Sequence, residues 1–114
     1  MVKFAAIAAA AALAGQVTAQ MPDTCFLRRS YCGGQLLSGS GQNYQNWEKR
    51  VDDALRADGL PIDGSHRYNT LFVCIGPTSL GVAQYCPAAG LACQPSNSDA
   101  CGHNTALNSC CGRN

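Results

Sequence analysis

The sequence lacks the short motifs that mark the common catalytic and metal sites. No C-x-x-C pair occurs, so neither a zinc ribbon nor a thioredoxin-type redox site has its usual spacing. A serine-hydrolase elbow, a phosphate-binding loop, a carboxylate pair and an EF-hand loop are also missing. We therefore predict that the protein is not an enzyme and binds no metal or cofactor.

Charge is sparse and balanced. Charged residues make up 13% of the chain, with eight Lys/Arg and seven Asp/Glu, and the loss of Lys3 with the leader described below leaves seven of each. The pairs at 28–29 and 49–50 are too short to form basic patches. We therefore expect neither nucleic acid nor an anionic membrane as the partner. No later apolar run is long enough for a membrane span.

The first residues have the layout of a secretory leader. Lys3 precedes an uncharged, mostly Ala/Leu run at 4–13, and residues 17–19 are small or aliphatic, as a signal peptidase requires. We predict a signal peptide at 1–19, cut after Ala19, and export of the mature chain 20–114. The mature chain then has 114 − 19 = 95 residues.

All eight cysteines lie in the mature part, and an exported chain of this size with an even number of cysteines indicates a disulfide framework. They are Cys25, Cys32, Cys74, Cys86, Cys93, Cys101, Cys110 and Cys111. Four disulfides can connect them in about 105 ways, and the sequence does not choose among these. Neighbouring cysteines point in different directions, so the last two should reach separate partners, with Cys74 as one candidate. A Cys/His metal site at Cys101 and His103 is disfavoured, because export favours disulfides over thiolates.

The clearest secondary-structure signal is an amphipathic helix over residues 44–58. Tyr44, Trp47, Val51, Ala54 and Leu55 recur at helical spacing on one face. The pattern predicts Asn43 as the N-cap, ion pairs from residue 49 to 53 and from 52 to 56, and a stop at Gly59 and Pro61. The two aromatic residues on this face are read as core residues in preference to a stacking site for a ligand.

Two strands should follow the helix. Residues 67–75, "RYNTLFVCI", are predicted as the central strand and residues 80–86, "LGVAQYC", as its hairpin partner. Residues 20–30 should form an arm, with an edge strand as an option, and "YCGGQLLSGSGQN" a Gly/Ser-rich loop. The polar tail from residue 86 should be held by disulfides, with short strands near Leu91 and Leu107. The predicted fold is a single α+β domain, a helix on a small antiparallel sheet.

The stretch "SHRYN" at 65–69 resembles the segment after the helix of small secreted fungal ribonucleases of the guanyl-specific type. Those enzymes also need a glutamate, an arginine and a second histidine on later strands. Glu48 precedes the stretch, no Glu follows it, and no Arg lies between Arg67 and Arg113. We therefore interpret His66 as a loop histidine beside a turn.

The whole pattern resembles small secreted cysteine-rich effectors of filamentous fungi, including biotrophy-associated secreted proteins of the rice blast type. The matching features are the Ala-rich leader, "YCGG", "NTLFVC", "YC", "AC", "DACG" and the closing "SCC". Hydrophobins also have eight cysteines, but their two internal CC pairs do not match a single terminal one.

The resemblance implies a non-enzymatic, secreted protein that acts in the host apoplast or at the fungus–plant interface during plant colonisation. Its expected partner is a host protein or a cell-wall component, bound by a monomer. The alternatives are an antimicrobial or killer-type toxin, a degenerate ribonuclease-like protein and an inhibitor.

Overall fold

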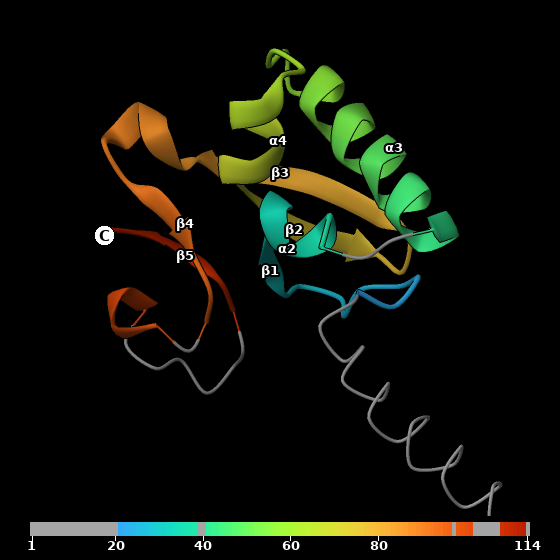
Figure 1. Cartoon of the computed structure of the whole chain (residues 1–114), viewed down its shortest axis with the longest axis horizontal. Coiled ribbons are helices and arrows are strands. Elements are labelled where there is room, and N and C mark those ends of the chain that lie inside the picture. Colours follow the sequence, from blue (N-terminus) through green and yellow to red (C-terminus); the bar gives the residue numbers. More distant parts are fainter. Residues whose placement is uncertain (1–20, 39–40, 97, 102–107, 114) are drawn as a thin grey trace, which may run out of the picture.

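The computed structural model describes residues 21–38, 41–96, 98–101 and 108–113, so the predicted leader lies outside the described residues. The fold is α+β, as predicted (Figure 1). The elements follow in the order β1 (Ser30–Cys32), α2 (Gly33–Leu36), α3 (Gly41–Ala57), α4 (Gly64–Asn69), β2 (Thr70–Gly76), β3 (Ser79–Tyr85), the 3-10 turn η2 (Cys86–Ala89), β4 (Ala92–Gln94), the 3-10 turn η3 (Asp99–Cys101) and β5 (Cys110–Gly112).

The larger sheet has the antiparallel order β1-β2-β3, with β2 in the centre. The predicted central strand and its hairpin partner are confirmed, but β2 begins at Thr70 because residues 67–69 belong to α4. Asp63 caps α4 by accepting a hydrogen bond from the His66 backbone N–H at 2.8 Å, which holds this stretch in a helix. β1 is the edge strand at the end of the predicted arm.

The predicted amphipathic helix is α3, which lies over the sheet (Figure 1). Trp47, Val51 and Leu55 are fully buried, while Tyr44 packs at the margin of the same cluster, so the reading of the aromatic residues as core is confirmed. Gly59 ends the helix with φ +74°, and the Leu60 N–H donates to the Leu55 carbonyl at 2.9 Å.

Two details before and at the start of α3 differ from the prediction. The Gly/Ser-rich segment contains the short helix α2, and α3 begins at Gly41, so Asn43 is inside the helix and is not its N-cap. α2 packs so closely on α4 that a Cβ on Gly33 would lie 1.6 Å from the Arg67 carbonyl oxygen. Glycine at this position allows the two short helices to meet.

One of the two predicted ion pairs on α3 is present. Lys49 Nζ lies 2.7 Å from Asp53 Oδ2. The predicted pair between Asp52 and Arg56 is wrong, because Asp52 instead accepts two hydrogen bonds of 2.9 Å from Arg67 of α4. Arg56 pairs with Asp53 at 3.1 Å. The bidentate contact of Asp52 therefore ties α3 to α4.

Four disulfides pair all eight cysteines: Cys25 with Cys74, Cys32 with Cys93, Cys86 with Cys111, and Cys101 with Cys110. The two adjacent cysteines near the C-terminus do reach separate partners. Cys74 is not one of them, because the arm passes beside β2 and brings Cys25 to it.

The tail forms a second, two-stranded antiparallel sheet of β4 and β5, on the side of the molecule away from α3 (Figure 1). β4 begins at Ala92, next to the predicted strand near Leu91. Leu107 lies outside the described residues, and the partner strand is Cys110–Gly112. In the part of the chain described by the structure, no helix has the length and hydrophobicity needed to cross a bilayer.

Candidate binding surface

The ribonuclease-like stretch contributes contacts within the fold. His66 is part of α4 and not of a loop, which corrects the interpretation from the sequence. Its Nδ1 atom lies 2.8 Å from Asp63 Oδ1, and its ring stacks on Tyr85 with centroids 3.9 Å apart. The Tyr85 hydroxyl in turn bonds to the Ser65 hydroxyl at 2.7 Å. The imidazole is thus held between the cap of α4 and the end of β3.

The other two residues of the ribonuclease comparison, Glu48 and Arg67, lie on α3 and α4. The Tyr44 hydroxyl donates to Glu48 Oε2 at 3.4 Å. A hydrogen bond with Tyr68 and the charge of Glu48 raise the pKa of Tyr44, whereas the hydrogen bonds to Asp52 raise that of Arg67. The contacts of Glu48 and Arg67 are therefore with α3 and α4 residues, and those of His66 are with Asp63 and Tyr85. That the protein is not an enzyme stays a prediction.

A metal ion also needs several ligands in one place. Within the described ranges, no three His, Cys, Asp or Glu side chains gather in a way that could hold one. The cysteine sulfurs, which are the softest ligands in the chain, are used in the disulfides.

Two of the three most exposed large apolar side chains among the described residues lie on the arm, and the third is Ile75 of β2, which is 60% exposed. Phe26 is 62% and Leu27 is 59% exposed, and Arg28 and Arg29 follow them directly. We call these four residues the 26–29 loop. Exposed aromatic and arginine side chains together are typical of the residues that dominate protein interfaces.

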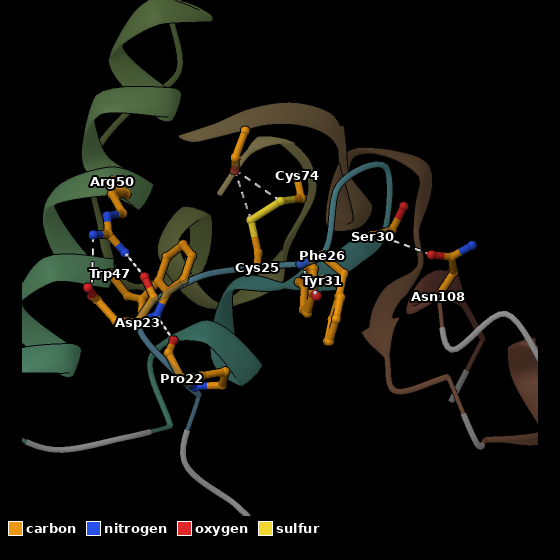
Figure 2. Close-up of a disulfide and its surroundings, with 11 residues drawn as sticks. Pro22, Asp23, Cys25, Phe26, Ser30, Tyr31, Trp47, Arg50, Cys74 and Asn108 are labelled. Atoms are coloured by element: carbon orange, nitrogen blue, oxygen red, sulfur yellow. Dashed lines mark hydrogen bonds and ion pairs between the residues drawn. A yellow bond between two sulfur atoms is a disulfide. The ribbon is translucent and has the colours of Figure 1, made fainter. Parts of the chain in front are cut away.

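The backbone of the 26–29 loop is fixed at both ends (Figure 2). Cys25, before the loop, is buried and bonded to Cys74 of β2. The Phe26 N–H donates to the Tyr31 hydroxyl at 3.0 Å, and the Arg29 N–H donates to the Phe26 carbonyl at 3.1 Å, which closes a tight turn. A loop that is already ordered loses little conformational entropy on binding.

β2 holds the second half of the same loop. The Arg28 N–H donates to the Cys74 carbonyl at 2.8 Å, and the Cys74 N–H donates to the Arg29 carbonyl at 2.9 Å. Arg28 has φ +72° and is the one non-glycine residue with a positive φ in the described chain. This conformation costs an L-residue about 1–2 kcal/mol. Such strain persists where the surroundings determine the backbone, and it is concentrated at functional sites.

The arm before the loop is docked on α3. Trp47 Nε1 donates to the Pro22 carbonyl at 2.8 Å, and Arg50 Nη1 donates to the Asp23 carbonyl at 2.7 Å (Figure 2). The Arg50 guanidinium also lies 3.3 Å from the Asp23 carboxylate and stacks over the Trp47 ring at 4.6 Å. The 26–29 loop therefore projects from a supported segment.

A hollow of about 260 Å³ lies beside the loop, between the arm, β1, α2 and Ser96, which follows β4 (Ala92–Gln94). Phe26 and Arg29 form part of its wall, with the Arg29 guanidinium 4.4 Å from the centre of the Phe26 ring. Tyr31 and Gln35 line it from β1 and α2. A second hollow of about 310 Å³ on the other side of Gln35 is lined by the Cys32–Cys93 disulfide and Tyr68. Both hollows thus lie next to α2.

From the sequence, residues 26–29 belong to the arm, and their two arginines are too short a run to form a basic patch. The signal that could have shown the surface is local. Two large apolar residues next to two cations, directly after a cysteine, cannot all be buried in so short a segment. Their three-dimensional setting, with Tyr31 and Cys74 as supports, depends on pairing between distant segments.

Comparison with protein-family models, with curated proteins and with solved structures finds no match. The fold and the geometry of this surface are therefore the basis for the functional argument.

Proposed function

We propose that the protein is a secreted, non-enzymatic fungal effector that acts during plant colonisation by binding a host protein or wall component. The observation that carries this proposal is the 26–29 loop, which presents two exposed apolar side chains and two cations on an ordered backbone. The four disulfides support it further, because they indicate an oxidising compartment. The predicted leader at 1–19 and the resemblance of the cysteines and their flanking residues to the fungal pattern point in the same direction.

The loop is suited to binding because none of its four side chains belongs to the buried core cluster. Leu27 is more than half exposed, so it adds little to the buried cluster. No ion pair joins Arg28 or Arg29 to a carboxylate among the described residues. Binding a partner would bury this apolar surface, which stabilises a complex by about 25 cal/mol per Å² before the costs of association are subtracted.

The test is capture of partners from plant apoplastic fluid by the immobilised, disulfide-intact protein. We expect that Leu27→Asp lowers capture at least about tenfold, because a carboxylate at the tip would be desolvated in the interface. Ile62→Asp is the control, since it introduces the same carboxylate at an apolar residue outside the loop, although Ile62 is 36% exposed against 59% for Leu27. Equal thermal midpoints would show that both variants fold.

Capture that is equally strong with Leu27→Asp would contradict the role of the loop. A parallel assay on competing microbes and leaf tissue tests the class of function. Killing of microbes without any plant phenotype would favour the toxin alternative and contradict the effector proposal.

A further inference from the structure

We propose that the hollow beside the 26–29 loop recognises an apolar side chain with an adjoining carboxylate on a partner protein. This inference rests on the proposed function, because it names the partner chemistry of the same surface. Arg29 would bind the carboxylate, and the walls formed by Met21, Phe26 and Tyr31 would hold the apolar group.

The size and lining of the hollow favour a single side chain. Its volume of about 260 Å³ is just below the range of about 300–1,000 Å³ that holds drug-sized ligands. Met21 and Tyr31 are buried residues of the core cluster that also border the hollow, so its base is apolar. Thr24 and Gln35 add hydrogen-bonding groups beside this base.

The charge of the site argues for an acidic group on the partner. All seven Asp and Glu residues belong to the described chain, and none of them forms an ion pair with Arg28 or Arg29. Five of the seven lie on α3 or in the segment up to the cap of α4: Glu48, Asp52, Asp53, Asp58 and Asp63. Neither arginine of the loop is therefore neutralised by an Asp or Glu side chain, and a guanidinium can bind a carboxylate through two parallel hydrogen bonds.

The walls of the hollow are ordered before a ligand arrives. The Tyr31 hydroxyl accepts the Phe26 N–H at 3.0 Å, and Gln35 Oε1 accepts the Ser109 hydroxyl at 3.0 Å. The Arg29 guanidinium is stacked on the Phe26 ring, which restricts its position. A preformed site has a smaller entropic cost of binding.

A concave site beside the loop also distinguishes a protein partner from a lipid surface. An anionic membrane would contact the exposed tip at Leu27 and leave the hollow unfilled. A protein side chain can enter the hollow while the tip contacts the surrounding surface. The structure therefore favours a protein, and membrane binding becomes an outcome of the test.

The test uses N-acetyl-L-phenylalanine as the probe and its neutral carboxamide as the comparison, with ¹⁵N-labelled, disulfide-intact protein observed by NMR. We expect saturable shifts confined to residues 21–31, Gln35 and Ser96, with a dissociation constant of about 1 mM for a ligand of this size. The carboxamide should bind about tenfold more weakly, because it is neutral and has one acceptor oxygen, so it cannot form the bidentate ion pair with the guanidinium.

Arg29→Gln should weaken binding of the acid about tenfold and weaken binding of the carboxamide much less, because only the acid loses an ion pair. Arg56→Gln removes the same charge from α3 and should change neither. Thermal midpoints close to the parent value would show that both variants fold. Equal binding of acid and carboxamide, undiminished binding by Arg29→Gln, or no shifts at 10 mM probe would each overturn the inference.

Vesicles with about 30 mol% phosphatidylserine test the alternative that this surface binds an anionic membrane. If they bind the parent but not Arg29→Gln, and the acid gives no shifts, the surface is a lipid contact and the inference is wrong. The proposed function is tested separately. Loss of capture from apoplastic fluid by Leu27→Asp without acid binding would keep the effector proposal and remove this partner chemistry. Binding of the acid, together with capture that Leu27→Asp does not affect, would keep this partner chemistry and contradict the role of the loop in the proposed function.

Discussion

Residues 21–85 and residues 86–113 are held together by different interactions. The buried hydrophobic cluster of the described chain takes all its members from Met21 to Leu80, on the arm, α2, α3 and the larger sheet. The tail has the smaller sheet, and three of the four disulfides end in it. The comparison shows that one small chain uses apolar burial where side chains suffice and covalent links where they do not.

The largest expected effect tests whether apolar burial holds residues 21–85 together. Trp47 is fully buried and its indole N–H donates to the Pro22 carbonyl. Trp47→Ala should lower the free energy of unfolding by about 3–5 kcal/mol, through lost burial and the cavity that remains. Denaturant unfolding measures this, and Lys49→Ala on the exposed face of α3 should change it by less than about 0.5 kcal/mol. A small loss for Trp47→Ala would contradict a core centred on α3.

Removal of a disulfide tests whether covalent links hold the tail, residues 86–113, in place. Cys86→Ser combined with Cys111→Ser opens the link across 25 residues, which should cost about 2–4 kcal/mol. We expect the loss to be regional. Amide hydrogen exchange should speed up in β4 and β5, while α3 keeps protection close to that of the parent.

The matched control replaces Cys25 and Cys74 by Ser, which should speed up exchange in β2 and the 26–29 loop and leave β4 and β5 protected. If both double variants lose protection throughout the chain, the two regions unfold as one unit and the comparison fails.

A smaller effect tests the packing of α2 on α4 within residues 21–85. Two neighbouring glycines of α2 differ in their surroundings there. A Cβ on Gly33 would meet the Arg67 carbonyl oxygen at 1.6 Å, but on Gly34 the nearest atoms, of Tyr68, are 3.6 Å away. Gly33→Ala should therefore cost about 1–3 kcal/mol by forcing α2 and α4 apart. Gly34→Ala should have little effect on the thermal midpoint. Equal midpoints for the two variants would show that α2 and α4 do not pack as described.

The smallest effect concerns the cap of α4. The hydrogen bond from the His66 backbone N–H, together with the His66 side chain, holds the pKa of Asp63 below its ordinary value of 3.8. A carboxyl group with a lowered pKa in the folded state stabilises the protein above the ordinary pKa. This stabilisation is lost as the pH falls through the lower, folded-state pKa.

We therefore expect parent and Asp63→Asn to differ in thermal midpoint near pH 6, and the difference to shrink as the pH falls below about 4. Asn keeps the capping oxygen, so the comparison isolates the charge. A difference that stays constant down to pH 2 would contradict the assignment.

The sequence was sufficient for the parts of the fold that depend on local periodicity. Trp47, Val51 and Leu55 recur at helical spacing, and residues 70–76 and 79–85 are rich in β-formers, so α3 and the hairpin could be predicted. Gly59 marked the end of α3 because its left-handed conformation favours glycine.

The remaining elements depend on contacts between distant segments. α4 has no fully buried residue, so no apolar pattern signals it, and it begins because Asp63 caps it. α2 starts with two glycines, which are poor helix formers, and it packs against the Arg67 backbone. Three further features could not be predicted from local sequence, because each depends on how the arm and α4 dock. They are the partner of Asp52, the pairing of Cys74 and the exposure of Phe26.

The pattern of the disulfides has a consequence for survival in a protease-rich fluid. The links overlap along the chain, because each of the intervals 25–74, 32–93 and 86–111 begins before the previous one ends. One peptide bond cut anywhere between Cys25 and Cys111 therefore leaves every fragment covalently attached to the rest. A single nick should be invisible by mass on a non-reducing gel, and it would release no piece of the domain until a reductant acts. The 26–29 loop lies within the first interval, so cleavage after Arg28 or Arg29 would leave both new ends joined through Cys25 and Cys74.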